Sequence, residues 1–101
     1  MISMICSILS GICFFNAIPH LVQGICGKKH MTPLSPQSSA LVNVIWGWIN
    51  IICGLFFLLW SQCYTWQTIH WILFCLGAIG ISIFLAIFWS NPNARLPWHR
   101  D

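Results

Sequence analysis

Polar side chains recur at helical spacing in two otherwise apolar stretches of this 101-residue chain. Asn16, His20 and Gln23 follow one another at intervals of four and three residues, and Asn43 and Asn50 lie seven apart, so each set shares one face of a helix. His20 is the one member able to titrate near neutral pH, and the carboxamides could orient it or a ligand. The candidate ligand-binding residues, called the polar seam below, are Asn16, His20, Gln23, Asn43, Trp46 and Asn50.

The rest of the sequence argues against an enzyme. Its one acidic residue, Asp101, is the last residue, so no internal carboxylate is present for acid–base work or cation binding. The six cysteines form no C-x-x-C pair and suit small apolar fillers in helices. No serine triad or phosphate-binding loop is present. We therefore expect no catalytic residues, no metal ligands and no cofactor.

Composition places the seam in a membrane. The chain is 58% hydrophobic and 5% charged, whereas soluble domains carry about 25% charged residues. Three uncharged runs, at 2–25, 40–60 and 68–89, each match the roughly 20 residues that cross a bilayer. The expected fold is a single all-α transmembrane domain over 1–101, with three helices, a polar loop at 27–39 and a surface tail at 91–101.

The connections fix how the helices are arranged. The link between the second and third helices is so short that they must form an antiparallel hairpin. Pro19 should kink the first helix or end its regular part near Ile18. The 27–39 loop has no helical or strand periodicity, so we expect it to be exposed, with Ser38 or Ser39 capping the second helix.

All the basic side chains lie on one side of this arrangement. The positive-inside rule then puts that side in the cytoplasm and the N-terminus outside. This pattern also makes nucleic-acid binding improbable and the lipid bilayer the expected partner. His70 opens the third helix near the outer surface, where we expect it to be half exposed. The basic residues are Lys28, Lys29, Arg95 and Arg100.

The second helix is predicted to be central, because Asn43, Gly47, Asn50 and Gly54 share one face that should look at protein and not at lipid. Aligning the ends of the first two spans sets Asn16 beside Asn50, His20 beside Trp46 and Gly47, and Gln23 beside Asn43. Structural bonding between the helices is the main interpretation of this seam, and a small polar pocket is the alternative. A small-residue row on the third helix should pack on the second helix or on another copy; it comprises Cys75, Ala78, Ser82 and Ala86.

The depth of each residue in the membrane also limits which side chains can bind one ligand or form one bond together. His70 aligns with about residue 4 of the first helix, so roughly 24 Å of helix separates it from His20. Both histidines cannot ligate one haem within a monomer, although a haem shared between two copies through His20 stays open. Cys6 and Cys63 align in depth, and a disulfide between them would need Cα atoms within about 7 Å.

Several of these residues form a larger pattern. Asn16, Pro19 and His20, then Gly24 and Gly27, Thr32 and Pro33, and finally Asn43, Trp46 and Gly47 give N-x-x-P-H, G-x-x-G, T-P and N-x-x-W-G. This pattern, over about the first half of the chain, resembles a family of small bacterial integral membrane proteins without an established activity. The resemblance implies that the polar seam and the 27–39 loop act as a unit.

Three functional hypotheses follow. The leading one is a non-enzymatic protein of the bacterial cytoplasmic membrane that acts by associating with itself or with a larger membrane protein. The first alternative is a small transporter or channel subunit whose polar path uses Asn16, His20, Asn43 and Asn50. The second is a quinone- or haem-binding membrane subunit that uses His20.

Overall fold

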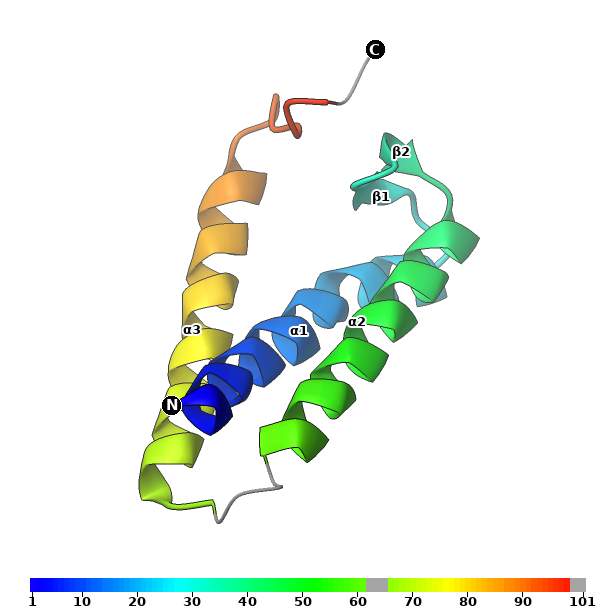
Figure 1. Ribbon diagram of the computed structural model, residues 1–101. Coiled ribbons are helices and arrows are strands. Elements are labelled where there is room, and N and C mark those ends of the chain that lie inside the picture. The colour runs from blue at the N-terminus through cyan, green and yellow to red at the C-terminus, as the bar shows by residue number, and fades with distance from the viewer. Residues whose placement is uncertain (62–65, 99–101) are drawn as a thin grey trace.

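In a computed structural model, the chain forms three long helices and a small β-hairpin, and the structure describes residues 1–61 and 66–98 (Figure 1). Each helix is long and apolar enough to cross a membrane. The predicted all-α transmembrane fold is confirmed, and the spans expected at 2–25, 40–60 and 68–89 differ from the helices by at most one residue. The elements are α1 (Ile2–Ile25), β1 (His30–Thr32), β2 (Ser35–Ser38), α2 (Ala40–Ser61) and α3 (Thr68–Ser90).

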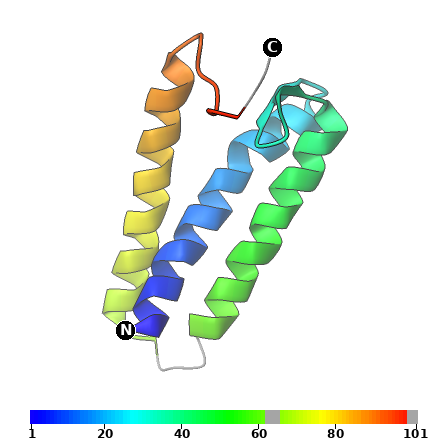
Figure 2. The same ribbon diagram turned by 45° about the horizontal axis from the view of Figure 1, so that its top comes forward.

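Helix α1 lies between α2 and α3 and packs along both (Figures 1 and 2). Helices α2 and α3 run antiparallel, as predicted, but among the described residues they make almost no direct contact with each other. The prediction that the second helix is central was therefore wrong. Helix α1 takes that place because it carries small or polar residues toward both neighbours, including the buried Ser3, Ser7, Ser10, Gly11, Ala17 and Gly24.

Glycines bring α1 and α3 into backbone contact. A Cβ added to Gly77 would overlap the carbonyl oxygen of Ile8, and one added to Gly11 would overlap the carbonyl oxygen of Phe74. Of the predicted small-residue row, only Ala78 is buried, and it lies at this contact with α1 and not against α2. Its other members are exposed, namely Cys75, Ser82 and Ala86.

The end of α1 turns the chain back over the bundle. The helix is continuous through Pro19, the residue predicted to kink or end it, and stops at Ile25. Gly27 has φ +76°, a conformation that favours glycine. Its N–H donates to the Gly24 carbonyl, and the Lys28 N–H donates to the Gln23 carbonyl, which is the Schellman pattern of helix ends.

The segment after this turn is folded, which corrects the prediction of an exposed loop at 27–39. Strands β1 and β2 pair antiparallel, with His30 opposite Ser38. Met31 and Thr32 are buried. Strands of three and four residues are too short for a sequence period to show. Ser39 caps α2 as expected, because its Oγ accepts the Val42 N–H at 3.2 Å.

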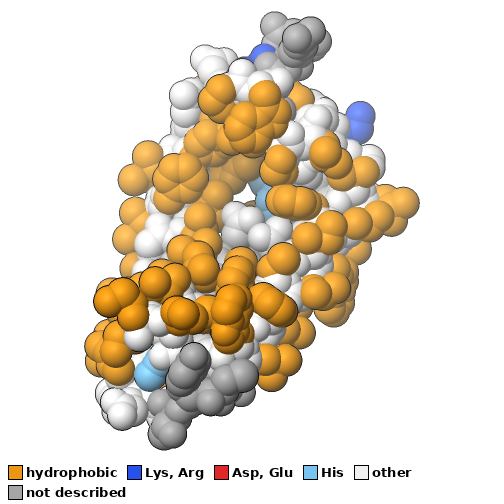
Figure 3. Space-filling view, viewed as in Figure 1, with side chains coloured by type: hydrophobic (Ala, Val, Ile, Leu, Met, Phe, Trp, Pro, Cys, Tyr) orange, Lys and Arg blue, Asp and Glu red, His pale blue; other side chains and the backbone are white. Residues whose placement is uncertain are grey.

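Apolar side chains cover most of the face that Figure 3 shows. Large hydrophobic residues are exposed along all three helices, for example Val22, Ile52 and Ile83, each more than half exposed. A surface of this kind suits acyl chains and not water. The protein is thus a multi-pass membrane protein.

Candidate functional site

Asn43 is the most connected side chain of the polar seam and is fully buried. The two hydrogens of its Nδ2 are shared among the carbonyl oxygens of His30 at 2.9 Å, Ser38 at 3.2 Å and Ser39 at 3.0 Å. Its Oδ1 lies 2.8 Å from Nδ1 of His20. The carbonyls around Nδ2 fix which way the amide points. One side chain therefore joins α1, α2 and the β-hairpin.

This arrangement sets the tautomer of His20. An amide oxygen only accepts hydrogen bonds, so Nδ1 of His20 must carry the hydrogen that Asn43 receives. In the neutral imidazole, Nε2 is then an acceptor. His20 is 6% exposed, and no residue within 1–61 or 66–98 donates a hydrogen bond to Nε2. The ring presents one free lone pair.

A second pair of hydrogen-bonded side chains lies farther along the same helices. Asn16 Nδ2 donates to Asn50 Oδ1 at 3.0 Å, and Asn50 Nδ2 donates to the Trp46 carbonyl at 3.0 Å. The predicted pairing of Asn16 with Asn50 is confirmed. His20 also lies near Trp46 as predicted, with 6.5 Å between ring centroids.

The predicted pairing of Gln23 with Asn43 was wrong, because His20 is the α1 side chain that bonds to Asn43. Helix α2 approaches α1 closely at Gly24, where an added Cβ would lie 2.7 Å from the Ala40 carbonyl oxygen. His20, one turn before Gly24, therefore faces α2. Gln23 is half buried.

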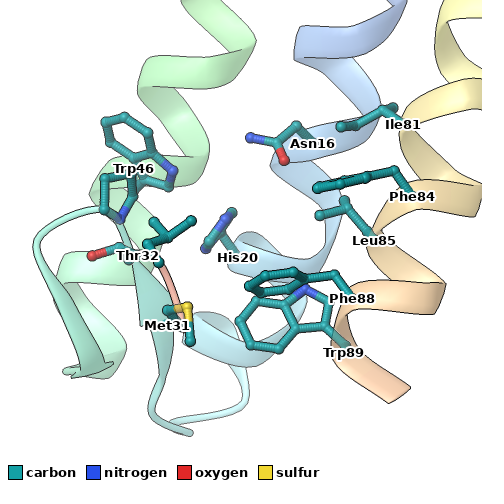
Figure 4. Close-up of a pocket in the computed structure, with 12 residues that line it drawn as sticks. Asn16, His20, Met31, Thr32, Trp46, Ile81, Phe84, Leu85, Phe88 and Trp89 are labelled. Carbon is teal, nitrogen blue, oxygen red and sulfur yellow. The ribbon is translucent and has the colours of Figure 1, made fainter. Parts of the chain in front are cut away.

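A half-open pocket of about 170 Å³ lies beside His20, lined by residues of all three helices, the β-hairpin and the C-terminal tail (Figure 4). His20 and Asn16 line it from α1, and Trp46 lines it from α2. Phe84, Phe88 and Trp89 line it from α3, so its walls are mostly apolar rings. We call it the His20 pocket. Gln23, Asn43 and Asn50 are not among its lining residues.

His30 and Trp89 extend this group of rings toward the hairpin. Their ring centroids lie 4.3 Å apart, and the His20 ring lies 5.2 Å from His30. Burial lowers the pKa of His30, and the neighbouring His20 lowers it further. Nε2 of His30 and Nε1 of Trp89 are buried without a hydrogen-bond partner. Ring packing thus holds the hairpin to the bundle in addition to the hydrogen bonds from Asn43.

A polar cluster at the other end of the bundle was missed from the sequence. His70 was expected to be half exposed, but it is 4% exposed. Its Nδ1 accepts the Gln67 N–H at 3.0 Å, and its Nε2 lies 3.1 Å from Ser3 Oγ. Ser10 Oγ donates to the Gly54 carbonyl at 2.9 Å. The sequence does contain a pattern that could have predicted this cluster. Ser3, Ser7 and Ser10 have helical spacing and lie on the face of α1 that continues to Ala17 and His20.

The haem and disulfide alternatives can be compared with the described part of the chain. No group of three or more His, Cys, Asp or Glu side chains within 1–61 and 66–98 could hold a metal ion. Cys6, Cys13, Cys26, Cys53 and Cys75 are free, and the alternative bond from Cys6 to Cys63 lies outside the described residues. The His20 pocket is smaller than the 300–1,000 Å³ that drug-sized ligands occupy, so it does not fit a haem.

Searches against protein-family models, curated proteins and solved structures found no match to this chain.

Proposed function

We propose that this chain is a non-enzymatic protein of the bacterial cytoplasmic membrane that acts by associating with another membrane helix, from a second copy or from a larger protein. The observation that carries the proposal is an apolar groove of about 370 Å³ between α1 and α3. Gly77 and Gly80 line it, and nothing lies within 4 Å of the position that a Cβ of Gly80 would occupy. Small residues on an open helix face allow another helix to approach closely.

The burial of the three helices supports the same conclusion. In the 18-residue apolar window of α3, 11% of residues are buried, against 28% for α1 and 22% for α2. Helix α3 is held to the bundle mainly on the side of Gly77 and Ala78. Most of its surface is free to meet lipid or a partner, and helix association in lipid depends on packing and not on a hydrophobic driving force.

The transport alternative has less support. The seam amides are used for bonds within the protein: Asn16 to Asn50, and Asn43 to His20 and the hairpin carbonyls. A polar path would need groups left free to exchange partners with a solute. The same bonds favour structural bonding as the role of the seam, since they join α1 directly to α2.

The resemblance to small bacterial membrane proteins and the positive-inside rule supply the rest of the proposal. Lys28, Lys29 and Arg95 lie at the end of the bundle that carries the hairpin and tail, so we assign this end to the cytoplasm and the N-terminus to the outside.

Thiol crosslinking in native membranes tests the association. One variant carries Gly80→Cys, in the groove on α3, as its single cysteine, and a matched variant keeps only Cys53, which is exposed on α2. We expect the Gly80→Cys variant to give a discrete crosslinked species at a higher yield than the Cys53 variant. Recovery of monomer alone from both variants would contradict the proposal.

A further inference from the structure

We infer that the His20 pocket binds one aromatic ring that carries a hydroxyl group, as in a phenol or the head group of a lipid-soluble quinol. This inference does not depend on the association proposed above. It goes further than a general quinone site, because it states which hydrogen-bonding partner the protein provides.

The size of the pocket limits the ligand. Its volume is about 170 Å³, and an apolar cavity of about 150 Å³ in another protein binds benzene. A single six-membered ring therefore fills the space. The ring faces of Phe84, Phe88 and Trp89 on α3 suit edge or stacked contacts with such a ring (Figure 4).

The lone pair of His20 selects the polar group. Because Asn43 receives the hydrogen on Nδ1, Nε2 of the neutral ring can only accept. His20 is more than nine-tenths buried and lines the pocket. Leaving an acceptor unpaired in an apolar space costs free energy. A ligand that donates a hydrogen bond to Nε2 removes this cost and so binds more tightly than a ligand that can only accept. A hydroxyl satisfies this requirement, and a quinone carbonyl or an ether oxygen does not.

Asn16 strengthens the selection. Its Nδ2 donates one of its two hydrogens to Asn50 Oδ1, and its own Oδ1, which only accepts, adds a second acceptor to the residues that line the pocket. His20 and Asn16 thus each bring an acceptor to the lining of the pocket. A ring with a hydroxyl donor matches them.

The test uses three fluorinated probes of nearly equal size with the full-length protein in lipid nanodiscs. 3-Fluorophenol donates a hydrogen bond, 3-fluoroanisole only accepts, and 3-fluorotoluene does neither. Binding is followed by ¹⁹F NMR titration, with protein-free nanodiscs measured in parallel to subtract partition into lipid. We expect saturable binding of 3-fluorophenol about three- to tenfold tighter than that of the other two, the effect of one neutral hydrogen bond.

Two pairs of variants identify the site. His20→Leu should remove the preference for 3-fluorophenol while 3-fluorotoluene still binds, and Gln23→Leu, on the same helix, should keep the preference. Leu85→Phe fills the pocket and should weaken all three probes, whereas Ile83→Phe adds the same ring at an exposed position of α3 and should not. Leu85→Phe leaves the His20 to Asn43 bond intact, so it tests the site even if His20→Leu does not fold.

The inference is overturned by any of three results. These are the absence of saturable binding, equal affinity for the three probes, and a 3-fluorophenol preference that persists in His20→Leu.

Discussion

His20 Nδ1 lies 2.8 Å from Asn43 Oδ1, and this single hydrogen bond joins α1 to the residue that also anchors the β-hairpin. The bond has two consequences. It fixes the fold at the end of the bundle where the basic residues lie, and it leaves Nε2 of His20 as a free acceptor in the pocket. A residue with a structural role thus sets the chemistry of its neighbour.

Replacing Asn43 with Ala should destabilise the protein more than replacing Asn50 with Ala. Asn43→Ala leaves His20 and hairpin carbonyls without their partner in a buried place, and we expect a loss of about 2–3 kcal/mol. Asn50→Ala removes one bond from Asn16 and should cost about 1 kcal/mol or less. The free energies of unfolding can be measured by denaturant titration in mixed micelles. Equal losses would show that Asn43 is not the anchor of this end.

Gly77 should not tolerate a methyl group. Its added Cβ would meet the Ile8 carbonyl, which belongs to the α1 backbone and cannot move aside, so α3 must shift. We expect Gly77→Ala to cost about 1–3 kcal/mol, the usual range for overpacking.

Gly80→Ala is the matched control for that change. Nothing lies near its Cβ position, and alanine is the better helix former, so the stability should stay the same or rise. Both variants can be compared by unfolding in the same micelles. A Gly77→Ala protein as stable as Gly80→Ala would mean that α1 and α3 are not in backbone contact.

Acid should weaken the docking of the hairpin through His30. The side chains that face His30 are His20 and Trp89. Burial lowers the pKa of His30 in the folded protein, and the neighbouring His20 is the second cause. The unfolded chain then takes up the proton first as the pH falls. The contribution of neutral His30 to the free energy of unfolding is therefore fully present above about pH 6.5, the ordinary pKa of histidine, and is lost as the pH falls below that value.

His30→Phe is the control for this titration, since it keeps a ring against Trp89 and cannot be protonated. Thermal unfolding at pH 7.5 and pH 5.5 should show a larger loss in the original protein than in His30→Phe. The same loss in both would assign the pH dependence to other groups.

The proposed orientation predicts which cysteine is reachable from outside the cell. Cys26 is exposed and lies two residues before Lys28, so a membrane-impermeant maleimide should label it only after the cells are permeabilised. An Ile2→Cys variant should be labelled in intact cells. The reverse pattern would invert the topology.

The helix bounds and the pairing of Asn16 with Asn50 could be predicted from the sequence, because length, hydropathy and helical spacing are local properties. The pairing of Asn16 with Asn50 follows from equal depth in the two helices. Rotation about the helix axis does not follow from depth, which explains why His20 and not Gln23 meets Asn43.

The central position of α1 could not be deduced from the stripe on α2 alone. The polar face of α2 needs only one neighbouring helix to cover it. The small and polar residues of α1, among them Gly11, lie against two neighbouring helices, α2 and α3. The hairpin was missed because its strands are short, and its burial comes from tertiary contacts with Asn43 and the rings around His30.

The most direct test is ¹⁵N NMR of the histidine rings in nanodiscs at neutral pH, with His20 assigned by its loss in His20→Leu. The structure predicts hydrogen on Nδ1 of His20, no hydrogen on Nε2, and a shift of the Nε2 resonance on addition of 3-fluorophenol but not of 3-fluorotoluene. A hydrogen found on Nε2, or an Nε2 resonance unchanged by 3-fluorophenol, would contradict the account of the pocket.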